Sequence, residues 1–466
     1  MADFKSFKSV FKGDIVTQSD LDYEASISRW AINAARRAKY VAFVKDAEDV
    51  SVAVKFASAA RLPISIKGGG HNASGASSVE DGLVIDLSRY LNGVEIEPSK
   101  KIAKVQGGAL WATVDKDAIQ HGLATVGGTV NHTGVGGLTL GGGYGWLSGQ
   151  HGLTIDNLIQ ATVVVADGSI LTANDTQNSD LFWAIRGGGS NFGVCTEFIF
   201  QLHEQRRTVF SGPMIFPPPA IEEFMKVTQE WWKNGPSDKE AMIHGLSRGP
   251  DGNPVIIAIP FFNGSEAEGR AKFKAFFALK PIMDMCREIP YEELNSMLHT
   301  QNTFATPGRN AYMRGVVWRE PRIDTFAAEL EKVTEFSADG TYQVTVLFEY
   351  FQLAKVNSRG PDATAFRSRG PQLNVLCVAY WVNDTPEKSA KGRAIAHELN
   401  NIVESFESEQ PLEHENSGYT NCESDEVVTL DRKLRVFGNN YPRLQQIKKK
   451  YDPEMLFRRW WAITPA

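Results

Sequence analysis

Glycines gather in four clusters within the first half of this 466-residue chain, at 68–70, 127–128, 134–145 and 187–189. Glycine has no Cβ atom, so such a backbone reaches conformations that other residues avoid and leaves amide N–H groups uncovered. The clusters also contain leucine, valine and tyrosine, which serine-rich flexible linkers lack. The pattern predicts closely packed loops rather than good helices or strands. One extended, doubly phosphorylated cofactor would account for all four clusters.

The first cluster ends in a histidine. The sequence KGGGHN at 67–72 follows the apolar run 62–66, which alternates like the end of a strand. Its three glycines predict a loop that wraps an anionic group. An imidazole is not needed to hold a phosphate, so His71 is either incidental or has chemistry of its own.

The overall composition is that of an ordinary globular protein, with 42% hydrophobic and 22% charged residues. A net charge of −6 without a basic stripe argues against nucleic acid as a partner. No apolar run is long enough to cross a bilayer. The N-terminus alternates apolar residues with lysines, which predicts a partly ordered tail rather than a secretion signal. The lysine run 448–450 predicts a solvated helix end.

The four cysteines, Cys195, Cys286, Cys377 and Cys422, are widely spaced and form no C-x-x-C pair. This spacing predicts reduced thiols and a cytoplasmic protein. Packing roles are expected for Cys195 and Cys422. Both a monomer and a homodimer remain open.

The chain changes texture near residue 206. Before it, helices are predicted at 46–62, 110–120 and 180–185, and strands at 62–66, 83–87, 102–106, 158–165, 169–172 and 194–202. After it, helices are predicted at 220–234, 266–279, 324–336, 387–406 and 441–457, and strands at 255–262, 342–350 and 374–382. The second region predicts an antiparallel sheet with helices on one face and the other face free to cover a site, so the fold class is α+β.

Several common sites are excluded by their missing motifs. The chain has no G-x-x-x-x-G-K-[ST] sequence, and its glycine clusters do not form a strand–G-x-G-x-x-G–helix unit. The histidines lack metal-ligand spacing, so no metal site is expected. A G-x-S-x-G esterase elbow is also absent.

The ordered motifs carry a resemblance to a known family. They are KGGGHN at 67–72, VQGGA at 105–109, GVGGLTLGGGYG at 134–145, GLTIDN at 152–157, WAIRGGGSNFG at 183–193, ATAF at 363–366 with Arg369, YTN at 419–421 and NYPRL at 440–444. The series resembles the FAD-binding lobe of the vanillyl-alcohol oxidase superfamily. More narrowly, it is similar to the berberine bridge enzyme-like oxidases, in the group that includes 6-hydroxynicotine oxidase. The match runs from about residue 42 to the C-terminus.

The resemblance implies a two-lobed, PCMH-type FAD-binding domain joined to a substrate domain. The FAD lobe spans 1–206 with its core at about 36–206, the substrate domain spans 207–424, and a berberine bridge-like segment at 425–466 returns to the FAD lobe. The implied FAD-binding residues are Lys67, Gly68, Gly69, Gly70, His71, Asn72, Ser74, Gly75, Gly128, Val130, Thr133, Gly134, Gly136, Gly137, Leu138, Gly141, Gly142, Tyr144, Gly145, Gly152, Asp156, Asn157, Gly193, Val194, Asn440 and Tyr441.

In such a family His71 would bond covalently to the 8α-methyl group of the flavin. Many relatives carry a cysteine for a second link, four residues before the glycine that matches Gly134. This chain has Val130 there, so a single link is expected. A covalent flavin is retained and becomes more oxidising.

The resemblance also implies a base that removes a proton while hydride passes to the flavin. Where many relatives have Tyr-x-Asn-Tyr-x-Asp, this chain replaces the second tyrosine with Cys422. The candidates for site-lining or base residues are Tyr419, Asn421, Glu423, Tyr312, Glu349 and Tyr350. No sequence feature chooses among them.

The expected activity is that of an oxidase. Hydride leaves a carbon next to a hydroxyl or amine of a small aromatic or alkaloid-like molecule of secondary metabolism, and O₂ is reduced to H₂O₂. Thr133 stands where an apolar side chain often flanks the flavin, and Met455 stands where relatives commonly have asparagine. A dehydrogenase, a carbohydrate oxidase and a catalytically idle flavin-binding protein therefore stay as alternatives.

Overall fold

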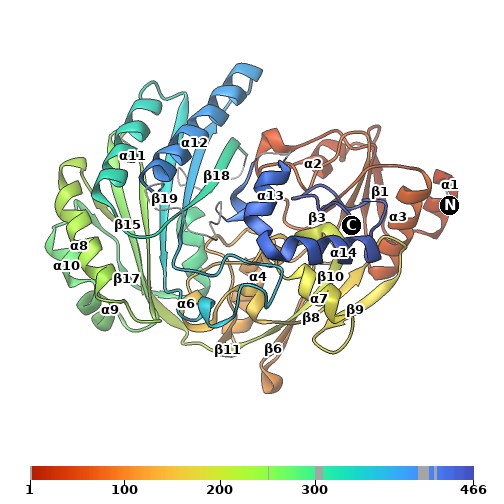
Figure 1. Ribbon diagram of the computed structural model, residues 1–466, viewed down its shortest axis with the longest axis horizontal. Helices are drawn as coiled ribbons and strands as arrows, with labels where there is room; N and C mark the ends of the chain where they lie inside the picture. The colour runs from red at the N-terminus through yellow and green to blue at the C-terminus, as the bar shows by residue number, and fades with distance from the viewer. Residues whose placement is uncertain (1–2, 250, 300–307, 408–418, 425–427) are drawn as a thin grey trace.

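The computed structural model describes residues 3–249, 251–299, 308–407, 419–424 and 428–466. It has two lobes, with the N-terminal half of the chain on one side and a large sheet covered by helices on the other (Figure 1). This confirms the predicted α+β class. The two lobes meet along one face of the large sheet.

The first lobe holds a four-stranded sheet in the order β1-β2-β4-β3. The strands are β1 (Asp14–Thr17), β2 (Tyr40–Phe43), β3 (Ile64–Lys67) and β4 (Leu83–Asp86). β2 and β3 both pair with β4 in parallel, and β1 pairs with β2 in the antiparallel sense. The predicted helix at 46–62 is α3 (Ala47–Ala59), which begins where the Asp46 carboxylate accepts a hydrogen bond from the Asp49 N–H. α3 delivers the chain into β3, whose end carries the KGGGHN loop.

A five-stranded antiparallel sheet completes this lobe, in the order β5-β6-β10-β8-β9. Its strands are β5 (Val94–Glu97), β6 (Ile102–Gln106), β8 (Leu158–Val164), β9 (Ile170–Asn174) and β10 (Val194–Gln201). The hairpin signal at Asp167-Gly168 joins β8 and β9, and Gly168 has a φ of 83°. β7 (Leu123–Ala124) and β11 (His203–Glu204) form a separate pair.

Short helices connect these strands: α1 (Phe4–Val10), α2 (Tyr23–Ile27), α4 (Trp111–Ile119), α5 (Val135–Leu140), α6 (Ser148–His151) and α7 (Ser179–Ile185). The helix α5 lies inside the glycine run 134–145, where poor helix formation was predicted. It is only six residues long.

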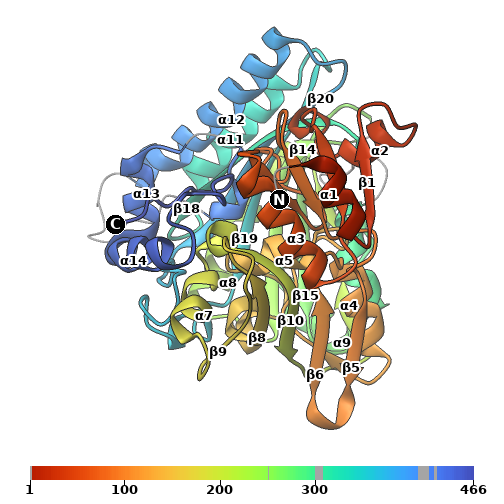
Figure 2. The same ribbon diagram turned by 90° about the vertical axis from the view of Figure 1, so that its right-hand side faces the viewer.

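The N-terminal segment is not a partly ordered tail, and that prediction is wrong. Residues from Phe4 form α1, which packs against α3 (Figure 2). Phe7 is fully buried, and its ring stacks on Phe56 with centroids 4.3 Å apart. The apolar spacing that resembled alternation provides one buried helix face.

The second lobe is built on a nine-stranded antiparallel sheet. Its main path is β16-β13-β15-β14-β19-β20-β18, and β12 and β17 pair beside β15. The strands are β12 (Thr208–Ser211), β13 (Met214–Phe216), β14 (Glu240–Arg248), β15 (Pro254–Phe262), β16 (Met283–Asp284), β17 (Arg287–Pro290), β18 (Asn310–Trp318), β19 (Tyr342–Phe351) and β20 (Leu373–Trp381).

Helices cover one face of this sheet (Figure 1). They are α8 (Ile221–Lys233), α9 (Glu266–Lys272), α10 (Lys274–Ala278), α11 (Ile323–Phe336) and α12 (Pro386–Glu407). Along β19, Val344, Val346 and Phe348 pack in the core under the helices. Leu347 and Phe351 pack instead in the core shared with the first lobe. Side chains alternate along a strand, so this split identifies which face of the sheet meets the first lobe.

The C-terminal segment returns to the first lobe as α13 (Leu430–Phe437) and α14 (Tyr441–Tyr451). Their residues Phe437, Tyr441 and Leu444 belong to the first lobe's core. We keep the domain boundaries 1–206, 207–424 and 425–466 as a proposal supported by this packing.

The predicted solvated helix end at 448–450 is wrong for its first residue. Lys448 is fully buried, and its ammonium lies 2.6 Å from the Asp452 carboxylate, which is fully buried too. It also donates to the carbonyl oxygens of Asn191 and Phe457, each at 2.6 Å. Lys450 is exposed, as predicted. A run of like residues gave no sign that one member faces inward.

Candidate cofactor and substrate site

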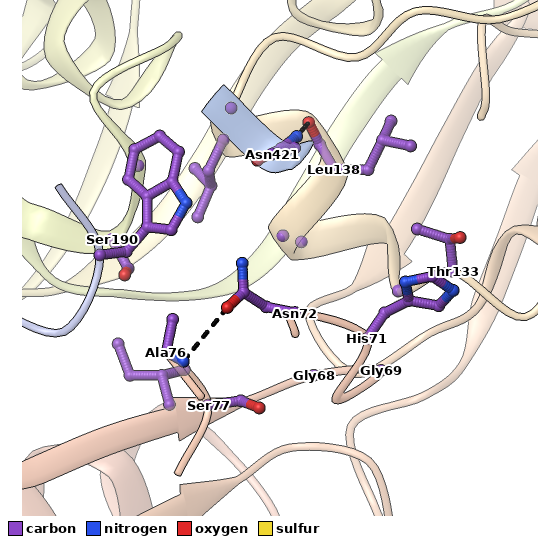
Figure 3. A pocket seen from close by; sticks show the side chains of 18 of the residues that line it. Gly68, Gly69, His71, Asn72, Ala76, Ser77, Thr133, Leu138, Ser190 and Asn421 are labelled. Carbon is purple, nitrogen blue, oxygen red and sulfur yellow. Dashed lines mark hydrogen bonds between the residues drawn. The ribbon is translucent and has the colours of Figure 1, made fainter. Parts of the chain in front are cut away.

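A deep pocket lies where the glycine loops of the first lobe face the large sheet. It holds about 1280 Å³ of space outside protein atoms, including its opening to solvent. The lining residues are Ile66, Gly68, Gly69, Gly70, His71, Asn72, Ala76, Ser77, Leu87, Gly107, Thr133, Gly134, Gly136, Gly137, Leu138, Leu140, Gly141, Gly189, Ser190, Gly193, Cys195, Phe198, Met313, Leu376, Tyr419, Asn421, Cys422 and Trp460. Figure 3 shows residues of both ends, with Asn421 and Leu138 across the cavity from Ala76 and Ser77. The space is therefore long enough in the chain's own terms to bring both lobes to one ligand.

Two glycine loops touch through their backbones on one wall. A Cβ atom on Gly69 would lie 2.6 Å from the Cα and N atoms of Gly134, and one on Gly134 would lie 2.5 Å from the Gly69 N atom. A Cβ on Gly68 would lie 2.9 Å from the carbonyl oxygen of Gly107. We call Gly68, Gly69, Gly70, Gly134, Gly136 and Gly137 the glycine cradle. Only glycine permits these approaches, which explains the density of the sequence pattern.

Asn72 fixes the turn that follows the first loop. Its side-chain oxygen accepts hydrogen bonds from the N–H groups of Ser74 and Ala76, at 3.0 and 3.2 Å. It also accepts from the Ser74 hydroxyl at 2.5 Å. Asn72 lines the cavity beside Ala76 (Figure 3). Ser74 therefore supports the wall without lining it.

His71 is held between two rings. Its imidazole stacks on Trp30 with centroids 4.4 Å apart and on His132 at 5.0 Å. Burial, and then the neighbouring His132, lowers the pKa of His71 to about 3, so the ring is neutral. Its Nε2 atom is buried and has no hydrogen-bond partner among the described residues. A buried polar atom left in this state indicates that something else completes it.

The segment at 419–422 forms the roof of the pocket. The Tyr419 hydroxyl oxygen accepts hydrogen bonds from the Gly143 N–H at 3.0 Å and from Asn421 Nδ2 at 2.8 Å. Asn421 also donates to the Leu138 carbonyl at 3.2 Å (Figure 3). Both groups donate to the phenol oxygen, so the Tyr419 proton remains to be donated. The roof is thus joined to the glycine loop beneath it.

Glycines on both sides leave room for this roof. A Cβ on Gly141 would lie 2.1 Å from the Asn421 side-chain oxygen. A Cβ on Gly315 of β18 would lie 3.1 Å from both the Cys422 Cβ and the Tyr419 carbonyl oxygen. The turn η8 (Thr420–Cys422) is therefore wedged between the first lobe and the large sheet.

About half of the predicted FAD-binding residues line the pocket. These are Gly68, Gly69, Gly70, His71, Asn72, Thr133, Gly134, Gly136, Gly137, Leu138, Gly141 and Gly193. The others do not line it: Lys67, Ser74, Gly75, Gly128, Val130, Gly142, Tyr144, Gly145, Gly152, Asp156, Asn157, Val194, Asn440 and Tyr441.

Several of those others hold the two lobes together. Asp156 accepts two hydrogen bonds from Arg369, at 2.7 and 3.0 Å, and this pair is nearly inaccessible to solvent. The Asn440 amide donates to the carbonyl oxygens of Pro361 and Thr364, at 2.8 and 3.2 Å. Tyr144 packs edge-on against Tyr419, with ring centroids 5.3 Å apart. Their motifs therefore report domain packing near the site.

Tyr419 and Asn421 are the only two of the base candidates that line the pocket. Tyr312 and Tyr350 lie on the face of the sheet under the helices, where Tyr312 contacts His397 and Tyr350 packs on His244. The alternation of side chains along a strand puts them on the wrong face for catalysis. Neither residue is carried forward as a base.

Glu423 is occupied by arginines. It forms ion pairs with Arg432 and, at 4.0 Å, with Arg314, and only 4% of its side chain is exposed. It does not line the pocket. The positive charges beside it favour the ionised carboxylate and occupy its oxygens, so we do not carry it forward.

Glu349 faces the first lobe from β19. Its side chain accepts a hydrogen bond from Asn374 Nδ2 at 3.2 Å. Burial raises its pKa to about 7, and the Asn374 hydrogen bond opposes this shift. Its charge raises the pKa of the pocket residue Cys422. Among the first-lobe-facing residues of the described strands β14, β15, β18, β19 and β20, Glu349 is the only carboxylate.

Sequence reasoning missed part of the lining. Met313 and Leu376 could have been found from strand alternation once the correct face was known. Cys195 and Cys422 line the pocket, in addition to packing roles. Ser77 and Trp460 gave no signal, because neither belongs to a motif that predicts a ligand contact.

The residues present fit FAD. The glycine cradle exposes backbone to a diphosphate, the loops can hold an extended molecule, and the buried Nε2 atom of His71 lacks a partner in the described chain. The fold and pocket together define an FAD-linked oxidoreductase. A family model described as FAD binding domain matches residues 38–174, and one described as berberine and berberine like matches residues 412–463.

Relatives extend this match over the whole chain. The FAD-linked oxidoreductase pgmH of Aspergillus terreus is 30% identical over 487 residues, covering 100% of this chain and 96% of that protein. The crystal structure of 6-hydroxy-D-nicotine oxidase from Arthrobacter nicotinovorans has a TM-score of 0.86 at 26% identity, covering 98% of each chain. The chain belongs to the berberine bridge enzyme-like family of FAD-linked oxidoreductases, as its sequence motifs predicted.

A more distant structure shares the fold. Glucooligosaccharide oxidase from Acremonium strictum has a TM-score of 0.84 at 23% identity, covering 99% of this chain and 98% of that chain, and its FAD is described as 6-S-cysteinyl and 8α-N1-histidyl.

Two further searches covered only the described residues. They contain no helix with the length and apolar character needed to cross a membrane. They also contain no group of three or more His, Cys, Asp or Glu side chains arranged to hold a metal ion.

Proposed function

We propose that this enzyme oxidises a small aromatic or alkaloid-like molecule at a carbon next to a hydroxyl or amine, with O₂ as the electron acceptor and H₂O₂ as the product. The observation that carries the proposal is the composition of the space between cradle and sheet. Met313, Leu376 and Cys422 meet the glycine loops there, with the Tyr419 hydroxyl as a polar group. FAD supplies the hydride-accepting chemistry when bound.

The lining supports an apolar substrate. Its side chains are mainly aliphatic, aromatic or absent, and Lys, Arg, Asp and Glu are missing from the described lining. A sugar would need many hydrogen-bonding groups to replace its hydration, because unpaired buried polar groups are costly. The lining therefore favours a flat, apolar molecule with one or two polar atoms over an oligosaccharide.

His71 is proposed as the single covalent anchor of FAD. Its neutral ring can act as a nucleophile, and the unpartnered Nε2 atom lies at the pocket. The histidyl link of the glucooligosaccharide oxidase is an analogy for this bond. Val130 has no nucleophilic atom, which supports one link rather than two.

Tyr419 and Glu349 are proposed for the handling of protons. The Tyr419 hydroxyl, held by Gly143 and Asn421, would orient the substrate's hydroxyl or amine. Glu349 would take the proton, directly or through one water, since its pKa of about 7 matches neutral operation. The nearby Asn374 amide would hold its carboxylate.

The function is tested with purified protein and a panel of phenolic alcohols, cyclic amines and oligosaccharides. We expect H₂O₂ only with aromatic alcohols or amines. Flavin bleaching without peroxide in air would indicate a dehydrogenase instead. Turnover of oligosaccharides alone would contradict the proposed substrate class, and lack of turnover with every compound would favour a flavin-binding protein.

The anchor is tested with His71→Ala. This variant should fold and bind FAD only reversibly, so denaturing gels lose flavin fluorescence and the intact mass falls by one FAD beyond the substitution. His121→Ala, at an exposed histidine, is the matched control and should keep the covalent flavin. Retained covalent flavin in His71→Ala would refute the assignment.

The base is tested with Glu349→Gln. In the parent, kcat/KM should rise with pH through about 7 as Glu349 loses its proton. Glu349→Gln should lower kcat/KM by about 10²-fold or more and abolish this rise. Tyr350→Phe, the neighbour on the opposite sheet face, should keep both the rate and the pH profile. An unchanged profile in Glu349→Gln would exclude it as the base.

A further inference from the structure

The pocket has a charge imbalance toward its cofactor. The diphosphate of FAD carries two negative charges. Among the described residues, however, the lining contains no lysine or arginine. Backbone N–H groups supply partial positive charge only. Any full positive charge that balances the diphosphate must therefore lie behind the wall.

Arg29 lies directly behind that wall. A Cβ atom on Gly70 would come within 3.3 Å of the Arg29 Cδ atom. Arg29 Nη2 donates to the Ser77 carbonyl oxygen at 2.7 Å, and Nε donates to the Ser77 hydroxyl oxygen at 3.1 Å. Gly70 and Ser77 both line the pocket. The guanidinium is therefore one residue's thickness from the cofactor space at two points.

The charge of Arg29 has no carboxylate of its own. Only 8% of the residue is exposed, and its hydrogen bonds go to the carbonyl oxygens of Ser26, Ser28 and Ser77 and to the Ser77 hydroxyl. The nearby Asp86 is paired with Lys67 at 2.8 Å. Burial lowers the pKa of Arg29 to about 10, so it stays protonated at neutral pH. A buried cation with neutral partners is costly unless an anion lies close to it.

Ser77 connects this cation to the pocket. Its hydroxyl oxygen accepts the Arg29 Nε–H, and no printed bond among the described residues uses its own hydrogen. A hydroxyl can accept and donate at once, so this hydrogen is available to an acceptor in the cavity. Accepting from a cation also makes the O–H a stronger donor.

We infer that Arg29 and Ser77 form the anion-binding element for the diphosphate of FAD, with Ser77 donating a hydrogen bond and Arg29 supplying the charge from behind. The inference concerns cofactor binding, so it rests on the FAD site and not on the reaction or on the covalent link. Its failure would leave the proposed oxidase activity untouched. Neither residue belongs to a sequence motif that predicts phosphate binding.

The test compares ADP with adenosine, because only ADP carries the diphosphate. Both are titrated by calorimetry into the full-length His71→Ala protein after removal of flavin. Arg29→Gln should weaken ADP binding by about tenfold or more and leave adenosine within about twofold, as expected for loss of one nearby charge. Arg61→Gln, which removes the same charge from an exposed position, should change neither.

A purely structural role for Arg29 gives a different result. Equal losses for ADP and adenosine, or an unchanged ADP affinity, would overturn the inference. If Arg29→Gln does not fold, Ser77→Ala decides the matter, since the Ser77 carbonyl still accepts from Arg29. Ser77→Ala should weaken ADP binding by about threefold to tenfold and spare adenosine. Unchanged ADP binding there would overturn the inference as well.

Discussion

The contact between Gly69 and Gly134 makes a quantitative prediction about the glycine cradle. Gly69→Ala places a Cβ atom 2.6 Å from two backbone atoms of Gly134, which is 0.8 Å short of ordinary contact at 3.4 Å. The Leu110 Cδ2 atom, at 3.1 Å, blocks a third direction. Backbone cannot rotate away as a side chain can, so the two loops must separate.

The expected cost follows from overpacking. Inserting one methyl group into a tight contact destabilises a protein by about 1–3 kcal/mol. Replacing glycine also restricts the unfolded chain, which returns about 0.4–1 kcal/mol. The net loss for Gly69→Ala is therefore about 1–2 kcal/mol in the flavin-free protein.

Gly137→Ala is the matched control on the same wall. A Cβ atom there meets no atom within 4 Å, and the residue lies within α5. Alanine gains up to about 1 kcal/mol of helix propensity over glycine, so the flavin-free protein should become slightly more stable. The new methyl group points into a residue of the pocket lining, so FAD binding should weaken.

The assay is urea unfolding of the flavin-free chain in the His71→Ala background, followed by FAD titration. Gly69→Ala should unfold at lower urea than its parent, and Gly137→Ala at equal or higher urea. Both should bind FAD more weakly. Equal unfolding midpoints for the two variants would refute the reasoning, because the contacts at Gly69 would then cost nothing.

Two further substitutions test buried ionisable groups. Burial raises the pKa of Asp115 from 3.8 to about 7, so between these values the folded chain binds a proton that the unfolded chain lacks, and stability falls as pH rises from about 4 to about 7. Asp115→Asn should remove this slope and raise the free energy of unfolding at about pH 8 by up to about 4 kcal/mol in urea titrations; an unchanged slope would contradict it. Lys448→Met leaves the Asp452 carboxylate buried without its cation and should cost about 3–5 kcal/mol in the same assay, whereas Lys449→Met, at an exposed lysine, should cost little. A loss below about 1 kcal/mol for Lys448→Met would show that the pair is not needed.

Local signals in the sequence were sufficient for most elements. Alternation, capping residues and the Asp167-Gly168 turn predicted strands and helices to within a few residues, as in α3 and β8. β14 and β18 were missed. Their residues are apolar on both faces, so the period of two that marks a half-buried strand is weak there.

Which face of a strand meets which lobe could not be read from the chain. Tyr312, Glu349 and Tyr350 were equivalent candidates in the sequence. Only the packing of the sheet separates Glu349, which faces the first lobe, from the two tyrosines beneath the helices. Neighbours in sequence point to opposite sides of a sheet, and the side that faces a ligand depends on contacts made by distant segments.

The sequence by itself determined the family, the α+β class, and the glycine loops with His71 at their exit, because close backbone approach demands glycine whatever lies opposite. The tertiary structure alone decided what each loop approaches: Gly134 against Gly69, and Arg29 behind Gly70. It also decided that Lys448 is buried while Lys449 is exposed. Residue type records a local constraint, whereas burial and charge balance depend on partners far away in the chain, which only folding brings together.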